Sequence, residues 1–266
     1  MRRRFFVDQF VGGRAVLEGE AAHHLGRVLR AERGQLYELS DGTRVCLARI
    51  EDVKRDRVEF FVVEDLPLVQ PKLQTTLLLA VVKFDAFEWA LEKATELGVS
   101  SIVPIAAARS EKALVAAAAK RADRWKKILF EASQQSRRVR LPALEPVTKS
   151  EKAFSSHNDD EALPIILSER ASAPSLRTIL EKGAGWKPAL QNGNVKLPLS
   201  TQALQKGGQV TTAVLAIGPE GGWTDIELQA AKDSQFREAS LGKLILRTET
   251  AVIAALAALN YALGEE

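Results

Sequence analysis

The sequence has little cysteine and little histidine, and this scarcity excludes several kinds of site. One of its 266 residues is cysteine, Cys46, so no disulfide can form within the chain, as is typical of proteins of the reducing cytoplasm. Of the three histidines, His23 and His24 are adjacent and cannot share a helix face as paired ligands would. The sequence therefore predicts no metal site and no histidine-based catalytic triad.

Long hydrophobic runs are also missing. The longest apolar stretches, such as Thr76–Val82 and Ala251–Leu259, fall well short of the ~20 residues that cross a bilayer. The apolar residues after Met1-Arg-Arg-Arg are too few for a signal peptide. We therefore expect a cytoplasmic protein with no membrane partner.

Two glycine-containing loops lie next to apolar, strand-like segments near the end of the chain. Ala213–Ile217 leads into Gly218-Pro-Glu-Gly-Gly, and Gly242 precedes Leu244-Ile-Leu-Arg-Thr-Glu-Thr. The first loop lacks the Gly-Lys-Ser/Thr of a nucleotide triphosphate site and the Gly-x-Gly-x-x-Gly spacing of a dinucleotide site. Plain turns would also explain these glycines. A pocket lined mostly by backbone is the alternative, and S-adenosylmethionine is a phosphate-free ligand that fits it.

Positive charge is concentrated in one segment. Residues 109–140 contain ten Lys and Arg against three acidic residues, an excess of +7 in a chain whose net charge is +3. Such a concentration indicates a polyanionic partner such as RNA, although a solvated helix face would give the same pattern.

The chain length and the proline positions predict two domains. Pro67 and Pro71 mark a boundary, so we expect a small, mostly β domain at 1–70 and an α/β domain with a largely parallel sheet at 71–266. Within the second domain, residues 183–208 are rich in Gly, Pro, Asn and Gln and predict a flexible insertion.

Hydrophobic periodicity and turn residues give the expected elements. In the first domain the sequence predicts a strand at 3–7, helical structure at 20–30, a hairpin with a two-residue turn at Asp41-Gly42 and a strand at 57–63. In the second it predicts strands at 76–82, 102–105, 163–167 and 213–217 and helices at 85–97, 120–137, 175–180 and 251–262. Thr224 and Glu227 have the spacing of a capping box, which predicts a further helix starting there.

Several motifs together resemble the ribosomal RNA small subunit methyltransferase E family. They are Ile217-Gly-Pro-Glu-Gly-Gly-Trp, Leu241-Gly-Lys-Leu-Ile-Leu-Arg-Thr-Glu-Thr-Ala, Lys83-x-Asp85 before Lys93-Ala-Thr-Glu-Leu-Gly-Val, Arg109-Ser110, Arg124-Trp125, Glu131-Ala-Ser-Gln-Gln-Ser-Arg137 and His24-x-x-Arg27-Val-Leu-Arg30. The likeness covers most of the chain outside 183–208.

The resemblance implies a fold and an activity. The fold would be a SPOUT-type trefoil-knot domain with a PUA-like β-barrel domain before it. The activity would be transfer of a methyl group from S-adenosylmethionine to N3 of a uridine in 16S rRNA of the small ribosomal subunit, by a homodimer formed through the knotted domains. Two alternatives remain: a SPOUT ribose 2′-O-methyltransferase acting on rRNA or tRNA, and a non-catalytic RNA-binding assembly factor.

The resemblance also implies site residues. The residues that it implies for cofactor binding are Leu167, Ser168, Glu169, Ile217, Gly218, Pro219, Glu220, Gly221, Gly222, Leu241, Gly242, Leu244, Leu246 and Thr250. Arg247 is expected to stabilise the uracil oxygens or the N3 anion, and Glu220 to face the sulfonium or the ribose. An ion pair of Arg247 with Glu249 or Glu220 is the alternative, as is a Glu220 carboxylate that binds N–H groups of its own loop. RNA binding is assigned to Arg3, Arg4, Arg27, Arg30, Lys83, Arg109, Arg124, Arg137 and Arg138.

Overall fold

The protein is described from a computed structural model that covers residues 4–69, 71–157, 161–183 and 210–264. The chain folds into two compact units. The first is Met1–Gln70 with Phe130–Leu141, and the second is Pro71–Leu129 with Pro142–Glu266. The predicted insertion at 183–208 lies outside the described residues apart from Gly183, and so does Arg3.

The first unit is a five-stranded sheet with two short helices. Its elements are β1 (Arg4–Phe6), β2 (Arg14–Glu18), α1 (Gly19–His23), the π-helix η1 (His24–Val28), β3 (Leu36–Ser40), β4 (Val45–Lys54) and β5 (Arg57–Asp65). The strand order is β1-β3-β4-β5-β2, and every pair is antiparallel except β1 with β3. In the described residues β1 and β2 are the edges of an open sheet. Alternate residues such as Ala15 and Leu17 face a core of their own.

The hairpin between β3 and β4 was predicted correctly, but its turn has four residues instead of two. The Asp41 carboxylate accepts hydrogen bonds from the N–H groups of Thr43 and Arg44, both at 2.8 Å. This side-chain acceptor replaces a main-chain partner inside the turn, so the connection needs no tight two-residue geometry.

Residues 130–141 return to the first unit from the end of helix α4 (Ala122–Gln135). The Phe130 ring packs on Phe6 with 5.7 Å between centroids, and the Ser40 hydroxyl donates to the Val139 carbonyl oxygen at 2.8 Å. Sequence analysis placed this stretch in the second domain, because contacts so distant along the chain leave no local pattern.

The second unit is built on a parallel sheet. Its elements are β6 (Gln74–Ala80), α2 (Phe84–Glu96), β7 (Ser101–Ala106), α3 (Lys112–Ala118), the 3-10 turn η2 (Ala119–Arg121), α4, β8 (Ala143–Leu144), β9 (Thr148–Lys149), α5 (Ser150–Ser156), β10 (Ala162–Leu167), α6 (Leu176–Gly183), β11 (Thr212–Ile217), α8 (Asp225–Asp233), β12 (Arg237–Ala239) and α9 (Thr248–Leu263). The strand order is β12-β10-β11-β6-β7-β8, with β9 also on β7, and every pair in this sheet is parallel. The α/β class and the largely parallel sheet are confirmed.

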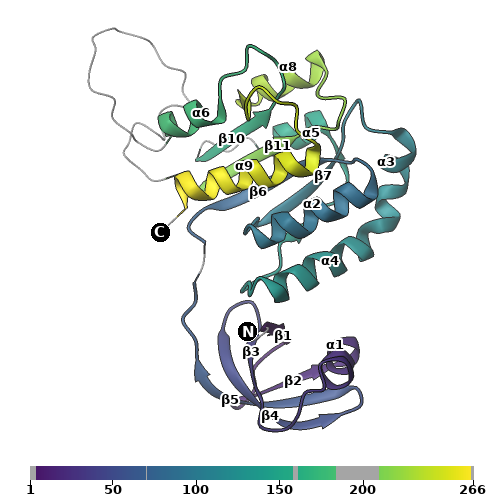
Figure 1. Cartoon of the computed structure of the whole chain (residues 1–266), viewed down its shortest axis with the longest axis vertical. Coiled ribbons are helices and arrows are strands. Elements are labelled where there is room, and N and C mark those ends of the chain that lie inside the picture. The colour runs from purple at the N-terminus through teal and green to yellow at the C-terminus, as the bar shows by residue number, and fades with distance from the viewer. Residues whose placement is uncertain (1–3, 70, 158–160, 184–209, 265–266) are drawn as a thin grey trace. The chain divides into compact units, whose positions relative to one another are not determined.

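Helices cover both faces of this sheet, because successive strand residues point to opposite sides. Leu77 and Leu79 of β6 belong to a core with α2, α4, α6 and α9, whereas Leu78 and Ala80 belong to a second core with α5 and α8. Figure 1 shows α2 and α9 in front of the sheet.

Several predicted helices have different bounds in the structure. The helix expected at 120–137 is three consecutive segments, α3, η2 and α4, that start at Lys112. The helix expected at 251–262 begins three residues earlier, at Thr248, because the Thr-Glu-Thr segment forms its first turn. Among the helices described here, none is long and apolar enough to cross a membrane.

Candidate functional site: a pocket at the carboxyl ends of three strands

A pocket of about 390 Å³ lies in the second unit, where β10, β11 and β12 end. The carboxyl ends of parallel strands lie at one edge of a sheet, so the three following loops meet there. Its volume is within the range of small-molecule sites, roughly 300–1,000 Å³. The pocket is lined by Arg109, Leu167–Arg170, Ile217–Trp223, Asp225, Leu228, Ser240–Leu246, Thr248 and Ala251.

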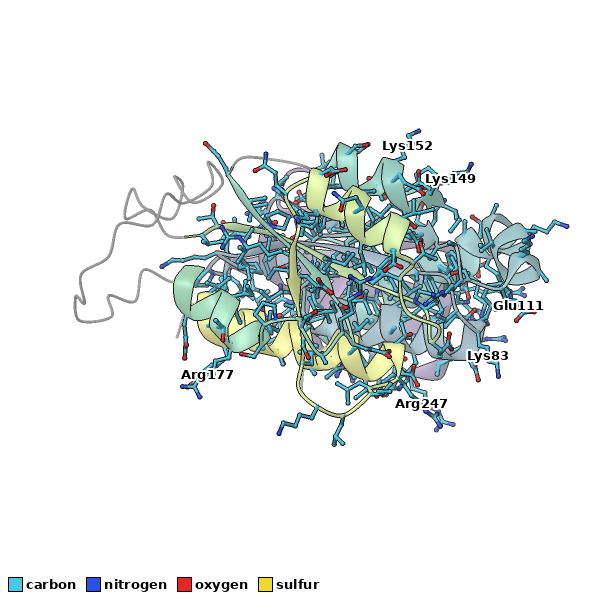
Figure 2. All side chains as sticks on the ribbon, turned by 90° about the horizontal axis from the view of Figure 1, so that it is seen from above. Lys83, Glu111, Lys149, Lys152, Arg177 and Arg247 are labelled. Carbon is cyan, nitrogen blue, oxygen red and sulfur yellow. The ribbon has the colours of Figure 1, made fainter. Side chains whose placement is uncertain are left out.

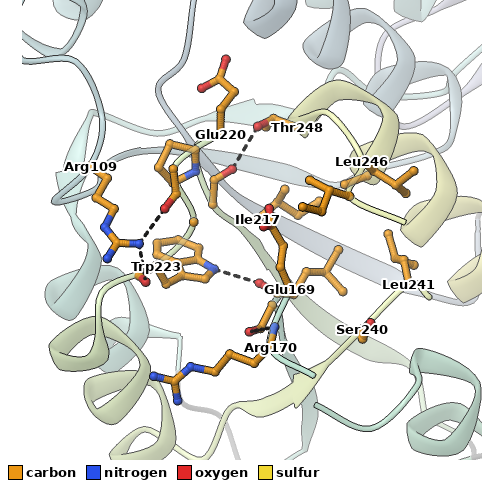
Figure 3. A pocket seen from close by; sticks show the side chains of 18 of the residues that line it. Arg109, Glu169, Arg170, Ile217, Glu220, Trp223, Ser240, Leu241, Leu246 and Thr248 are labelled. Atoms are coloured by element: carbon orange, nitrogen blue, oxygen red, sulfur yellow. Dashed lines mark hydrogen bonds between the residues drawn. The ribbon is translucent and has the colours of Figure 1, made fainter. Parts of the chain in front are cut away.

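The loop after β11 favours glycine at Gly218. A Cβ atom there would lie 3.0 Å from Cε2 of Trp223, so the indole ring would have to shift by a few tenths of an ångström. The indole ring is buried and its Nε1–H donates to the Leu167 carbonyl oxygen at 2.9 Å, which joins this loop to the end of β10 (Figure 3). Gly222 has a φ of +68°, which favours glycine, and its N–H bonds the Pro219 carbonyl oxygen at 2.8 Å.

The loop after β12 forms the remaining wall. Gly242 has a φ of +134°, and its N–H donates to the Ser240 hydroxyl at 3.2 Å. The buried Thr248 hydroxyl, at the start of α9, donates to the Gly218 carbonyl oxygen at 3.1 Å and ties this wall to the β11 loop. Leu244 is 83% exposed, so this wall presents apolar surface to solvent as well as to the pocket.

Two arginines also take part in the pocket. Arg109, from the segment between β7 and α3, donates from Nη1 to the carbonyl oxygens of Gly221 at 2.6 Å and Trp223 at 3.3 Å. Arg170, after β10, forms an ion pair with Asp225 at the start of α8. Local sequence patterns gave no sign of either contact.

Glu227 is a buried carboxylate just behind the β11 loop. The capping box is confirmed: the Glu227 N–H donates to the Thr224 hydroxyl at 3.3 Å and the carboxylate accepts the Thr224 N–H at 2.9 Å. The same carboxylate also accepts from the Ala108 N–H at 2.9 Å and the Ser150 hydroxyl at 2.7 Å. Burial raises the pKa of Glu227, but these hydrogen bonds outweigh burial and leave the pKa below its ordinary value.

The structure brings most of the sequence-predicted cofactor residues into this pocket. All of them line it except Thr250, which is exposed in the first turn of α9. Arg247 is the residue before α9 and does not line the pocket. Within the described residues neither Arg247 nor Glu220 has a side-chain hydrogen bond or ion pair, so their alternative roles are absent from this structure. The pocket further includes Trp223, Arg170, Asp225 and Thr248, which sequence reasoning missed. Trp223 could have been found from the sequence, because it is an aromatic residue directly after the glycines of the loop.

The basic residues predicted to bind RNA fall into two groups. Arg4 and Arg137 lie within 3.5 Å of the Glu38 carboxylate, and Arg124 bonds Glu88 at 2.7 Å. Burial lowers the pKa of Arg138 to about 10. The second group is exposed: for Arg27, Arg30 and Lys83 no side-chain partner occurs in the described part of the chain. Lys83 projects from the surface of the second unit, as does Arg247 (Figure 2).

Comparisons with known proteins identify the family. A family model described as an RNA methyltransferase domain matches residues 69–260. Ribosomal RNA small subunit methyltransferase E of Synechocystis sp. is 30% identical over 256 residues, which cover 95% of this chain and 75% of that protein. The Bacillus subtilis protein of the same name is 27% identical over 253 residues, covering 92% and 89% of the two chains. The chain belongs to the ribosomal RNA small subunit methyltransferase E family.

A solved member of this family has the same fold. The crystal structure of the Neisseria gonorrhoeae enzyme of this name superposes with a TM-score of 0.80 at 28% identity and covers 99% of both chains. That structure was determined with S-adenosylmethionine bound. Membership of the family is therefore supported by sequence and by fold over nearly the full chain.

Proposed function

We propose that this protein transfers a methyl group from S-adenosylmethionine to N3 of a uridine in the 16S rRNA of the small ribosomal subunit. The observation that carries the proposal is the pocket at the ends of β10, β11 and β12, formed by the loops whose sequences resemble the family's motifs. Membership of an S-adenosylmethionine-dependent rRNA methyltransferase family gives the reaction class.

The residues of the pocket suit this cofactor. Leu167, Ile217, Leu241 and Leu246 provide apolar surface for an adenine ring, and the glycines let main-chain groups approach it. Glu169 and Glu220 are among the residues that line the pocket, and negative charge near the pocket favours a cationic sulfonium. In the described residues no group of three or more His, Cys, Asp or Glu is arranged to hold a metal ion.

When bound, the cofactor supplies an electrophilic methyl group on a positively charged sulfur. The protein contributes position and charge. Uracil N3 must lose its proton, and Arg247, exposed at the start of α9, supplies a guanidinium that stabilises negative charge on the uracil oxygens. Glu220 is among the residues that line the pocket, and the proposal assigns its carboxylate to the sulfonium or the ribose of the cofactor.

RNA binding combines the exposed cations with the basic segment. Arg27, Arg30 and Lys83 are exposed, and Arg124 remains 62% exposed although it bonds Glu88. Arginine donates to phosphate through two parallel N–H groups, which suits Arg27, Arg30 and Arg124 to an RNA backbone. A uridine within folded rRNA must be turned out of its stack to reach the pocket.

The remaining features of the proposal concern architecture. We assign residues 1–70, together with 130–141, to a PUA-like RNA-binding domain and the rest of 71–266 to a methyltransferase domain whose chain end forms a trefoil knot. The enzyme is a cytoplasmic homodimer joined through Val252–Leu263. Support for that face comes from the apolar composition of α9 and from Tyr261, which is 94% exposed.

Nucleoside analysis tests the proposed function. Small-subunit RNA from a strain lacking the gene is incubated with the protein and S-adenosylmethionine, digested and analysed by mass spectrometry. The expected product is 3-methyluridine. A 2′-O-methyl nucleoside would replace this proposal with the ribose methyltransferase alternative. Absence of S-adenosylmethionine binding by calorimetry would favour a non-catalytic RNA-binding factor.

A further inference from the structure

Arg109 is attached to the pocket loop by its guanidinium and by its stem. Nη1 donates to the carbonyl oxygens of Gly221 and Trp223, at 2.6 and 3.3 Å. The aliphatic stem lies over Gly221, where an added Cβ would be 3.4 Å from both Cβ and Cδ of Arg109. In Figure 3 Arg109 reaches the loop from the side opposite Leu241 and Leu246. Arg109 therefore holds two carbonyl groups of the loop from one side of the pocket.

Glu227 fixes the start of the segment that carries Arg109. Its Oε1 atom accepts the N–H of Ala108, the residue before Arg109, together with the hydroxyl of Ser150. Its Oε2 atom accepts the N–H and the hydroxyl of Thr224, the residue after Trp223. One carboxylate thus joins the base of the Arg109 segment to the end of the pocket loop.

The four donors require an ionised acceptor. A carboxylate can accept from all of them, whereas the NH₂ group of a glutamine would oppose one of the two main-chain N–H groups. Glu227 is 1% exposed, so water cannot replace a lost partner. The arrangement closes a ring of contacts from Glu227 through Ala108 and Arg109 to Gly221 and Trp223 and back through Thr224.

We infer that Arg109 and Glu227 are positioning residues that hold the Gly218–Trp223 loop in the conformation that binds S-adenosylmethionine. The inference rests on the proposed function of the pocket. It changes the role of Arg109, which sequence analysis assigned to RNA. The loop contains three glycines and would otherwise sample many conformations, so fixing its carbonyl groups lowers the entropy lost on binding.

The test measures cofactor affinity by calorimetry for wild type, Arg109→Met, Arg109→Lys and Arg177→Ala. Methionine keeps an apolar stem over Gly221 but has no donor, so its dissociation constant should rise about tenfold, equivalent to about 1.4 kcal/mol. Lysine keeps a donor and should recover part of the affinity. Arg177 is the matched control, because it is an exposed arginine paired with Glu181 and does not line the pocket.

Turnover and RNA affinity distinguish positioning from other roles. For Arg109→Met, KM for the cofactor should rise, while kcat at saturating cofactor and affinity for rRNA without cofactor stay at the wild-type values. Glu227→Gln should also weaken cofactor binding, and its effect should not add to that of Arg109→Met because both act on one ring of contacts.

Any other result contradicts either the inference about Arg109 or the proposed function of the pocket. Wild-type cofactor affinity in Arg109→Met overturns the inference, and reduced rRNA affinity alone would return Arg109 to RNA binding. Failure of the wild-type protein to bind the cofactor would overturn the proposed function instead. Glu227→Gln could fail to fold, but the Arg109 variants change an exposed side chain and decide the inference without it.

Discussion

The loops of the pocket and the part of the basic segment from residue 121 to residue 140 are held in different ways. The pocket loops are joined through main-chain oxygens: Leu167 accepts from Trp223, Gly218 accepts from Thr248, and Gly221 accepts from Arg109. The arginines of the basic segment hold carboxylates or distant carbonyl groups with their own charged ends. These include Arg121 and Arg124 on Glu88, Arg137 on Glu38 and Arg140 on the Gly42 carbonyl oxygen.

Because of this difference, the formal charge of the segment is larger than the charge that remains for binding RNA. An excess of +7 over residues 109–140 overstates what the segment can offer RNA, because part of it is neutralised within the fold. Glu88 has a side chain only 11% exposed between two arginines, so its partners also stabilise a mostly desolvated carboxylate. Arg247 and Lys83 lie outside the segment, and in the described residues their side chains have no partner, so they remain available.

The largest expected effect comes from Arg247, an available cation beside the pocket. Arg247→Ala should lower kcat about 100-fold with little change in the dissociation constant of S-adenosylmethionine, because a lost charge-stabilising donor costs roughly 10²–10³ in rate. Single-turnover methylation of rRNA measures the first quantity and calorimetry the second. Arg177→Ala serves as control. Full methylation activity in Arg247→Ala would refute its catalytic role.

Next in size is the effect of a methyl group in the pocket loop. Gly218→Ala places a Cβ 3.0 Å from the Trp223 ring, and overpacking of this kind costs typically 1–3 kcal/mol, so cofactor affinity should fall about tenfold. Gly221→Ala is the matched variant, because its Cβ would make ordinary 3.4 Å contacts with Arg109. Calorimetry on both proteins gives the comparison. Equal cofactor affinities of the two variants would show that the Trp223 indole ring does not need glycine at position 218.

The sequence predicted those parts of the molecule that depend on local pattern. Strand periodicity placed β6, β7, β10 and β11, and the Thr224–Glu227 spacing placed the start of α8. The glycines marked the pocket because backbone conformation and close approach depend on the residue itself. Most of the predicted cofactor residues line one pocket, but that list came from the resemblance to a family and not from local pattern.

Contacts between distant segments could not be predicted in this way. Arg109 meets Gly221 across 112 positions and Glu227 meets Ala108 across 119, and nothing local distinguishes these side chains from solvated ones. Arg124 is separated from Glu88 by 36 positions. For the same reason charge counting could not separate the paired arginines from the available ones.

A smaller effect is expected for a paired arginine that remains exposed. Arg124→Glu should lower rRNA affinity about fivefold and reduce the dependence of log affinity on log salt by about one unit, the contribution of one phosphate contact. Cofactor affinity should not change, since Arg124 does not line the pocket. Filter binding over a salt series measures the effect, with Arg177→Glu as control. RNA affinity equal to that of wild type at moderate salt would remove Arg124 from the RNA site.

The smallest effect concerns the pH dependence of stability through Glu227. Its folded pKa lies below its ordinary value, so the ionised carboxylate stabilises the fold fully above an unfolded pKa of about 4.3. As the pH falls through the lower folded pKa this stabilisation is lost, with about 1.4 kcal/mol for each unit between the two pKa values. Urea unfolding from pH 5 downward should therefore show a steeper loss in wild type than in Glu227→Gln. Parallel curves would mean that the carboxylate does not hold its four donors more strongly when ionised. The conformation of the Gly218–Trp223 loop would then depend on the packing of Trp223 against Gly218.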